Sequence, residues 1–165
     1  MNLQRKNPVF VAACLVLSCL IFLPGCKKYP NGPWFTLRGK EARVVNSWCY
    51  ELVLRNGLDV TEGLPELSIV YSKSSIGFND DGRFSTIIHY SDSINFPAER
   101  YDGNWAFINN EEEILLDYDA PTPMAGDSQI WVITKLREKE LWAEEDFGSN
   151  LYEYRLFPSD SKETE

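Results

Sequence analysis

The sequence is short of the residues on which most catalytic and metal sites depend. Its 165 residues include one histidine, His89, and four cysteines, of which Cys14 and Cys19 lie in an N-terminal apolar run. A structural zinc site takes four Cys or His ligands, so Cys26, Cys49 and His89 are too few to form one. The patterns Gly-x-Ser-x-Gly, His-Glu-x-x-His and the P-loop are also missing. We therefore expect no enzymatic activity, no cofactor and no metal site.

Carboxylates are abundant, and they leave two further kinds of site open. They cluster at Asp80, Asp81, Glu111, Glu112, Glu113, Asp117, Asp119, Glu144, Glu145 and Asp146. A glycosidase needs two facing acids about 5–10 Å apart, which the sequence does not exclude. Most of these acids fall at predicted turns, however, and Asp80-Asp81 lacks the spacing of an EF-hand calcium loop. His89 falls on the polar face of its strand, where we expect it to be solvated.

The chain also lacks an apolar run long enough to cross a membrane. Its longest run, residues 9–23, has about 15 residues, whereas a spanning helix needs roughly 20. Arg5 and Lys6 precede this run, and Gly25 and Cys26 end it. A basic start, a short apolar stretch and small residues at the exit are typical of a secretory signal.

Residues 23–26, Leu-Pro-Gly-Cys, resemble the bacterial lipobox. The resemblance implies cleavage of residues 1–25 and acylation of Cys26, which becomes the lipid attachment site. Two or three acyl chains anchor a protein stably where a single chain does not. An uncleaved signal anchor and ordinary secretion remain alternatives. Because Lys27 stands where an Asp would resemble an inner-membrane retention signal, and no acidic run follows, we expect attachment to the outer membrane, facing the periplasm.

The mature chain is acidic and is long enough for one domain. Without residues 1–25 it has 140 residues and a formal net charge of −11. This charge argues against binding of nucleic acid or anionic head groups through the body of the protein. Residues 26–41 follow as the lipidated Cys and a tether rich in proline and glycine. The 15 residues after Cys26 could extend over roughly 50 Å.

From residue 42 onward the apolar residues recur at every second position, as they do in half-buried β-strands. Strands or hairpins are predicted at residues 44–57, 66–72, 75–93, 101–109, 113–119, 129–136, 141–147 and 150–157. Residues 79–82, Asn-Asp-Asp-Gly, form a predicted turn, and residues 120–128 a loop. In the first strand, alternation places Trp48, Tyr50, Leu52 and Leu54 on one face. Short strands joined by tight turns predict an all-β fold, an antiparallel up-and-down barrel of eight or nine strands.

The order of motifs over residues 42–157 is similar to that of the lipocalin-like lipoproteins of Bacteroidota. The motifs are Phe-Asn-Asp-Asp-Gly-Arg-Phe at 78–84, Gly-Asn-Trp at 103–105, and a closing pair of strands that ends in Tyr-Glu-Tyr-Arg-Leu at 152–156. The resemblance implies a calycin-type barrel at residues 42–157, followed by a disordered tail at 158–165. Residues 92–94, Asp-Ser-Ile, also match the O-glycosylation pattern of Bacteroidota proteins, which would modify Ser93.

Aromatic rings are the candidate binding residues. On the inward faces of the predicted strands stand Trp48, Tyr50, Phe84, Tyr90, Trp105, Phe107, Tyr118 and Tyr154. An eight-stranded barrel is just wide enough to be filled by its own side chains or to hold one small ligand. A hollow barrel predicts binding of a small hydrophobic or amphipathic molecule. A filled barrel predicts a protein-interaction module of the cell envelope, and two inward carboxylates would favour an enzyme.

Overall fold

A computed structural model describes residues 38–63, 69–91, 96–122 and 126–160 of the chain. The lipobox, Cys26 and Ser93 lie outside the described residues, so the predictions made for them remain predictions. Within the ranges just given, no helix is both long enough and apolar enough to traverse a bilayer.

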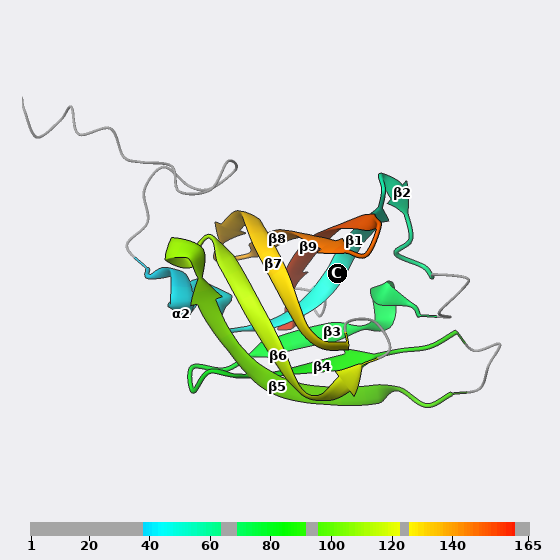
Figure 1. Cartoon of the computed structure of the whole chain (residues 1–165), viewed down its shortest axis with the longest axis horizontal. Helices are drawn as coiled ribbons and strands as arrows, with labels where there is room; N and C mark the ends of the chain where they lie inside the picture. Colours follow the sequence, from blue (N-terminus) through cyan, green and yellow to red (C-terminus); the bar gives the residue numbers. More distant parts are fainter. Residues whose placement is uncertain (1–37, 64–68, 92–95, 123–125, 161–165) are drawn as a thin grey trace, which may run out of the picture.

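The described chain forms a closed antiparallel barrel (Figure 1). Its strands are β1 (Ser47–Arg55), β2 (Leu58–Asp59), β3 (Ser75–Phe78), β4 (Arg83–Ile88), β5 (Glu99–Ile108), β6 (Glu113–Thr122), β7 (Gly126–Arg137), β8 (Glu140–Phe147) and β9 (Asn150–Pro158). Neighbours in the sheet follow the order of the sequence, and β1 also pairs with β9. Eight strands therefore close the barrel, and the two-residue strand β2 extends it beside β1. The all-β up-and-down barrel predicted from the sequence is confirmed.

The strand pairs follow from local signals in the sequence. The turn between β3 and β4 spans residues 79–82, as predicted, and Gly82 there has a φ of +80°. Phe84, Thr86 and Ile88 of β4 are buried on one face, which the alternation of the strand predicts. The predicted loop at residues 120–128 is shorter than expected, because β6 continues to Thr122 and β7 begins at Gly126.

Strand β1 contradicts the simple alternation expected of it. The register of its pairing with β9 shifts between Tyr50 and Leu52, which marks a β-bulge. Trp48 and Tyr50 face the interior as predicted, but beyond the bulge Val53 is fully buried while Leu52 and Leu54 are only half-buried. An extra residue in one strand moves every later side chain to the opposite face. The prediction that Leu52 and Leu54 share the face of Trp48 is therefore wrong.

Two short segments also differ from the predicted strands. Within residues 69–72 the chain makes one isolated bridge, between Ile69 and Tyr90, and then enters the 3-10 turn η1 (Tyr71–Lys73). The helix α2 (Lys40–Val44) lies across the predicted boundary between tether and barrel. Figure 1 shows α2 beside the end of the barrel where β5 turns into β6 through η3 (Asn109–Glu111).

The interior has an apolar half near α2 and a tyrosine-rich half at the opposite end. Near α2, Val44 and Trp48 are fully buried, and the indole Nε1 of Trp48 donates to the carbonyl of Val44 at 2.9 Å. Arg43 of α2 is also buried, and its guanidinium donates to the carbonyl of Leu136 at 2.7 Å. These two bonds hold α2 onto the barrel, because each satisfies a buried polar group that would otherwise lose its hydration.

Candidate functional site

The eight aromatic residues predicted to line the barrel separate into three groups. Tyr50, Tyr118 and Tyr154 line an internal cavity. Trp48, Phe84 and Trp105 are buried in the core, with Phe107 packed against Trp105 at a ring distance of 5.6 Å. Tyr90 is half-buried, and its hydroxyl donates to Glu99 at 2.8 Å. The structure therefore brings three of the predicted residues together and assigns the others to packing.

The internal cavity is small. Its volume is about 20 Å³, and besides the three tyrosines it is lined by Ile69, Tyr71, Ser74, Thr86, Ile88, Gln129 and Trp131. That volume accommodates about one water molecule, whereas sites for small organic ligands occupy roughly 300–1,000 Å³. Among the described residues the barrel is therefore filled by its own side chains.

Glu145 is the functional residue that the sequence reasoning missed, because none of the acidic residues in the strand predicted at 141–147 was assigned to an inward face. They belong to β8, where Leu141, Ala143 and Glu145 alternate toward the interior. Glu145 is only 4% exposed. Its Oε2 accepts a bond from the Tyr154 hydroxyl at 2.7 Å and one from Gln129 Nε2 at 3.1 Å. The period of two from Leu141 was the signal that could have identified it.

Burial controls the ionisation of this network. Desolvation raises the pKa of Glu145, although hydrogen bonds from Tyr154 and Gln129 oppose the shift. Desolvation also raises the pKa of Tyr154 well above its ordinary value. Beside the network, the Tyr71 hydroxyl and the indole Nε1 of Trp131 are buried and make no hydrogen bond of good geometry with the described residues. The interior therefore contains polar groups that are only partly satisfied.

The other candidate residues are placed as follows. His89 is half-buried, and its backbone N–H donates to Ser74 Oγ at 3.0 Å. Among the residues that the structure describes, Glu145 is the one buried acidic residue. No group of three His, Cys, Asp or Glu side chains with metal-binding geometry occurs in the same ranges.

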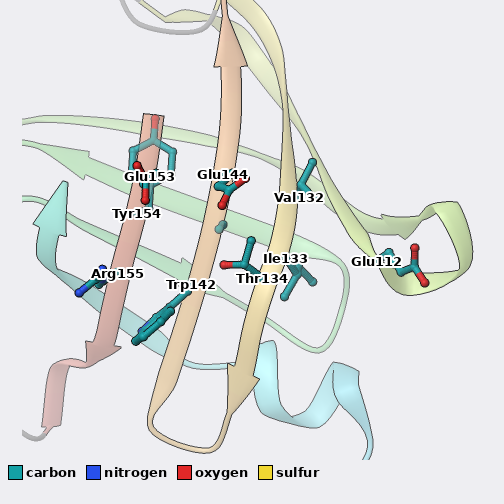
Figure 2. Close-up of a pocket in the computed structure, with 10 residues that line it drawn as sticks. Glu112, Val132, Ile133, Thr134, Trp142, Glu144, Glu153, Tyr154 and Arg155 are labelled. Atoms are coloured by element: carbon teal, nitrogen blue, oxygen red, sulfur yellow. The ribbon is translucent and has the colours of Figure 1, made fainter. Parts of the chain in front are cut away.

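A much larger hollow lies on the outer face of the barrel, across β7, β8 and β9 (Figure 2). Its volume is about 610 Å³. The side chains that face it include Val132 and Thr134 from β7, Trp142 and Glu144 from β8, and Glu153 and Arg155 from β9. Val132, Trp142, Glu144, Glu153 and Arg155 point outward because each alternates with a buried neighbour along its strand. Thr134 lies where the register of β7 with β8 shifts, between Ile133 and Lys135. Glu112 borders the same hollow from the turn before β6.

Two carboxylates of this hollow are directly opposed. Glu144 and Glu153 are partners in the antiparallel register of β8 and β9, and Val132 is the partner of Glu144 on β7. No hydrogen bond or ion pair satisfies either carboxylate within the described part of the chain. Val132 remains 44% exposed, and Ile130 on the same face of β7 is 47% exposed. The hollow thus combines unpaired negative charge with an exposed apolar wall.

The other end of the hollow contains an aromatic ring flanked by cations. Trp142 is the register partner of Lys135 on β7 and of Arg155 on β9. The Lys135 ammonium lies 3.8 Å from the centre of the indole ring, and the Arg155 guanidinium lies 4.7 Å from it. Lys135 also pairs with Glu140 at 2.6 Å. These contacts fix Trp142 against the barrel wall by cation–π attraction.

No known family matches the chain, and no curated protein shows significant similarity to it. The barrel is compatible with the calycin-type fold that the sequence motifs imply.

Proposed function

We propose that the protein is a non-catalytic, lipid-anchored protein of the cell envelope that binds a partner protein through the outer face of β7, β8 and β9. The observation that carries this proposal is the distribution of free space. The cavity between Tyr50, Tyr118 and Tyr154 has a volume of about 20 Å³, whereas the hollow on the outer face has about 610 Å³. A filled barrel favours contact through the surface over enclosure of a ligand.

Charge complementarity indicates the kind of partner that fits this face. The carboxylates of Glu112, Glu144 and Glu153 border the hollow. The hollow also contains the cation Arg155, which forms no ion pair with an acidic residue of the described chain. Val132 and Ile130 add apolar surface beside the acids. A partner segment that carries both positive charge and apolar side chains matches this surface, because opposite charges steer association and apolar burial stabilises the complex.

A photo-crosslinking experiment in cells tests the outer-face contact. A photoreactive amino acid at Val132 should form an adduct with one partner protein. The same residue at Ile87, which is 37% exposed on β4, serves as the control on another side of the barrel. Absence of an adduct from Val132, or equal adducts from both positions, would refute the outer-face proposal.

The anchor is supported by the lipobox-like residues 23–26 and by the proline- and glycine-rich stretch after Cys26. The intact mass of the membrane-extracted protein should equal residues 26–165 with two or three acyl chains. Cys26→Ser should prevent acylation and processing, so that no species of that mass is extracted. A mass equal to the unmodified full-length chain would exclude a lipid anchor.

Enclosure of a small hydrophobic ligand is the second candidate function. Its support is the pair of buried donors beside the cavity, Tyr71 Oη and Trp131 Nε1, that make no hydrogen bond of good geometry with the described residues. A ligand larger than one water would have to displace side chains of the filled core. Titration with fatty acids, haem and bile acids should therefore leave the tryptophan fluorescence unchanged. A saturable shift with any of these ligands would favour the interior site over the outer face.

A further inference from the structure

We infer that Glu144 and Glu153 form a receptor for one lysine or arginine side chain from an extended segment of the partner protein. This inference rests on the outer-face contact proposed above and specifies the chemical group recognised there. The two carboxylates face each other across β8 and β9 at the hollow of about 610 Å³.

The pairing of two like charges is the first argument. Like charges directly opposite in an antiparallel pair destabilise a sheet, whereas opposite charges stabilise it. Neither Glu144 nor Glu153 has a cation within the described chain to compensate the repulsion. An ammonium or guanidinium placed between them would form two charge-assisted hydrogen bonds at once. The isolated barrel therefore carries a repulsion that a cationic ligand removes.

The walls around the pair provide the second argument. Val132 is in register with Glu144 on one side, and it exposes 44% of its surface. Trp142 follows on the same outward face of β8, two residues before Glu144. Lysine and arginine side chains lay their methylene stems along apolar surface and keep the charged head in a polar site. The hollow offers both surfaces side by side, as Figure 2 shows for Val132 and Glu144.

The spacing along the strands supports an extended segment. Trp142 and Arg155 form the next outward pair after Glu144 and Glu153, so the two pairs lie about 7 Å apart along the strands. Alternate side chains of an extended peptide have the same spacing. A partner segment with a cation at one position and a carboxylate two residues away would place the cation at the acid pair and the carboxylate at Arg155. Arg155 has no ion pair with the described residues.

Calorimetric titration of the purified full chain in detergent tests this inference. The probe is the blocked peptide acetyl-Thr-Lys-Thr-Glu-Thr-amide, and the control peptide carries Nε-acetyl-lysine in place of lysine. We expect saturable binding of the first peptide that weakens as salt rises, because the pair is solvent-accessible. Binding of the control should be at least 10-fold weaker. Equal affinity for both peptides would overturn the inference.

Variants locate the binding to the acid pair. The double variant Glu144→Gln/Glu153→Gln should lower the affinity for the lysine peptide at least 10-fold, because both carboxylates are gone. It should also raise the melting temperature of the protein, because the repulsion between them disappears. The matched double variant Glu41→Gln/Asp80→Asn removes two exposed acids outside the hollow and should leave the affinity unchanged. A loss of binding accompanied by a lower melting temperature would indicate a merely structural role and contradict the inference.

The outcomes separate this inference from the proposed function. If Val132 forms an adduct with a partner but the lysine and acetyl-lysine peptides bind with equal affinity, the receptor for a cation is refuted. The proposed contact through the outer face would still be supported. If the molecular mass of the purified protein rises with its concentration, and the double variant reduces this rise, the face binds a second copy of the chain. That result would overturn the inference of a receptor for a partner protein.

Discussion

Glu145 places a carboxylate inside the barrel at 4% exposure, beside the hydroxyl of Tyr154. Desolvation raises its pKa in the folded state above the ordinary value of 4.5, so the folded protein holds this proton more tightly than the unfolded chain. The stability that Glu145 contributes is therefore fully present below pH about 4.5 and is lost as the pH rises through the folded pKa. At pH 7 the barrel is therefore less stable with Glu145 than it would be with an uncharged side chain at this position.

Glu145→Gln should remove this pH dependence, because glutamine stays neutral and can still accept the bond from Tyr154. Urea unfolding of both proteins between pH 4 and 8 measures the effect. We expect the free energy of unfolding of the variant, relative to wild type, to increase as the pH rises. The variant Asp80→Asn, which removes an exposed acid from the turn between β3 and β4, serves as the control. Parallel profiles for Glu145→Gln would contradict the assignment.

Gly103 explains why the Gly-Asn-Trp motif has glycine at its first position. A Cβ atom there would lie 2.3 Å from the carbonyl oxygen of Asp117 on β6 and 2.6 Å from the ring of Phe84 on β4. The neighbouring strands and the buried ring occupy the space that any other side chain needs. The motif therefore has a packing role in this protein.

Gly103→Ala should destabilise the barrel by about 1–3 kcal/mol, because the backbone of β6 must move to admit the methyl group. The midpoint of urea unfolding reports the loss. Gly39→Ala is the matched control, since nothing lies within 4 Å of a Cβ at that position. An equal response of the two variants would refute the close approach at Gly103.

At the scale of elements, Asn56 joins the turn after β1 to the start of β9. Its backbone N–H donates to the carbonyl of Leu151 at 2.8 Å, and its Oδ1 accepts from the Leu151 N–H at 2.9 Å. Its Nδ2 donates to Asn150 Oδ1 at 2.8 Å. Asn56 has a φ of +52°, a left-handed conformation that asparagine tolerates better than most residues. The residue thus supports the seam at which β1 and β9 close the barrel.

Asn56→Ala should lower the free energy of unfolding by about 1–3 kcal/mol, from two lost side-chain bonds and the strain of alanine at positive φ. Asn56→Gly loses the same bonds without the strain, so it should be less destabilising than alanine. Urea unfolding of the two variants separates the contributions. A lower free energy of unfolding for the glycine variant than for the alanine variant would show that backbone strain at position 56 plays no part.

The elements also show how far local patterns extend. The hairpin with its turn at residues 79–82 was predictable, because Asp-Gly and the alternation of Phe84, Thr86 and Ile88 are local signals. The bulge after Tyr50 was not, since it arises from the pairing of β1 with β9, about a hundred residues away. The strand at residues 141–147 was also predictable, but the inward position of Glu145 was missed, because its acidic neighbours obscured the period of two that continues from Leu141.

For the whole molecule, closure of the barrel predicts uniform protection of the sheet. In an open meander β1 and β9 would be edge strands with unpaired amides, whereas here they pair from Trp48 with Pro158 to Arg55 with Tyr152. Hydrogen exchange should therefore protect paired amides of β1 and β9 as strongly as those of β5 and β6. Fast exchange along β1 and β9, with slow exchange in β5 and β6, would indicate an open sheet.

The sequence by itself determined the all-β class, the order of the hairpins and most inward faces, because alternation and turn residues act over a few positions. Only the tertiary structure decided that the interior is filled, that Glu145 lies within it and that Glu144 faces Glu153 outside. These features depend on strand register and on how fully the rings occupy the enclosed volume. Both arise from contacts between distant segments, which no local pattern contains.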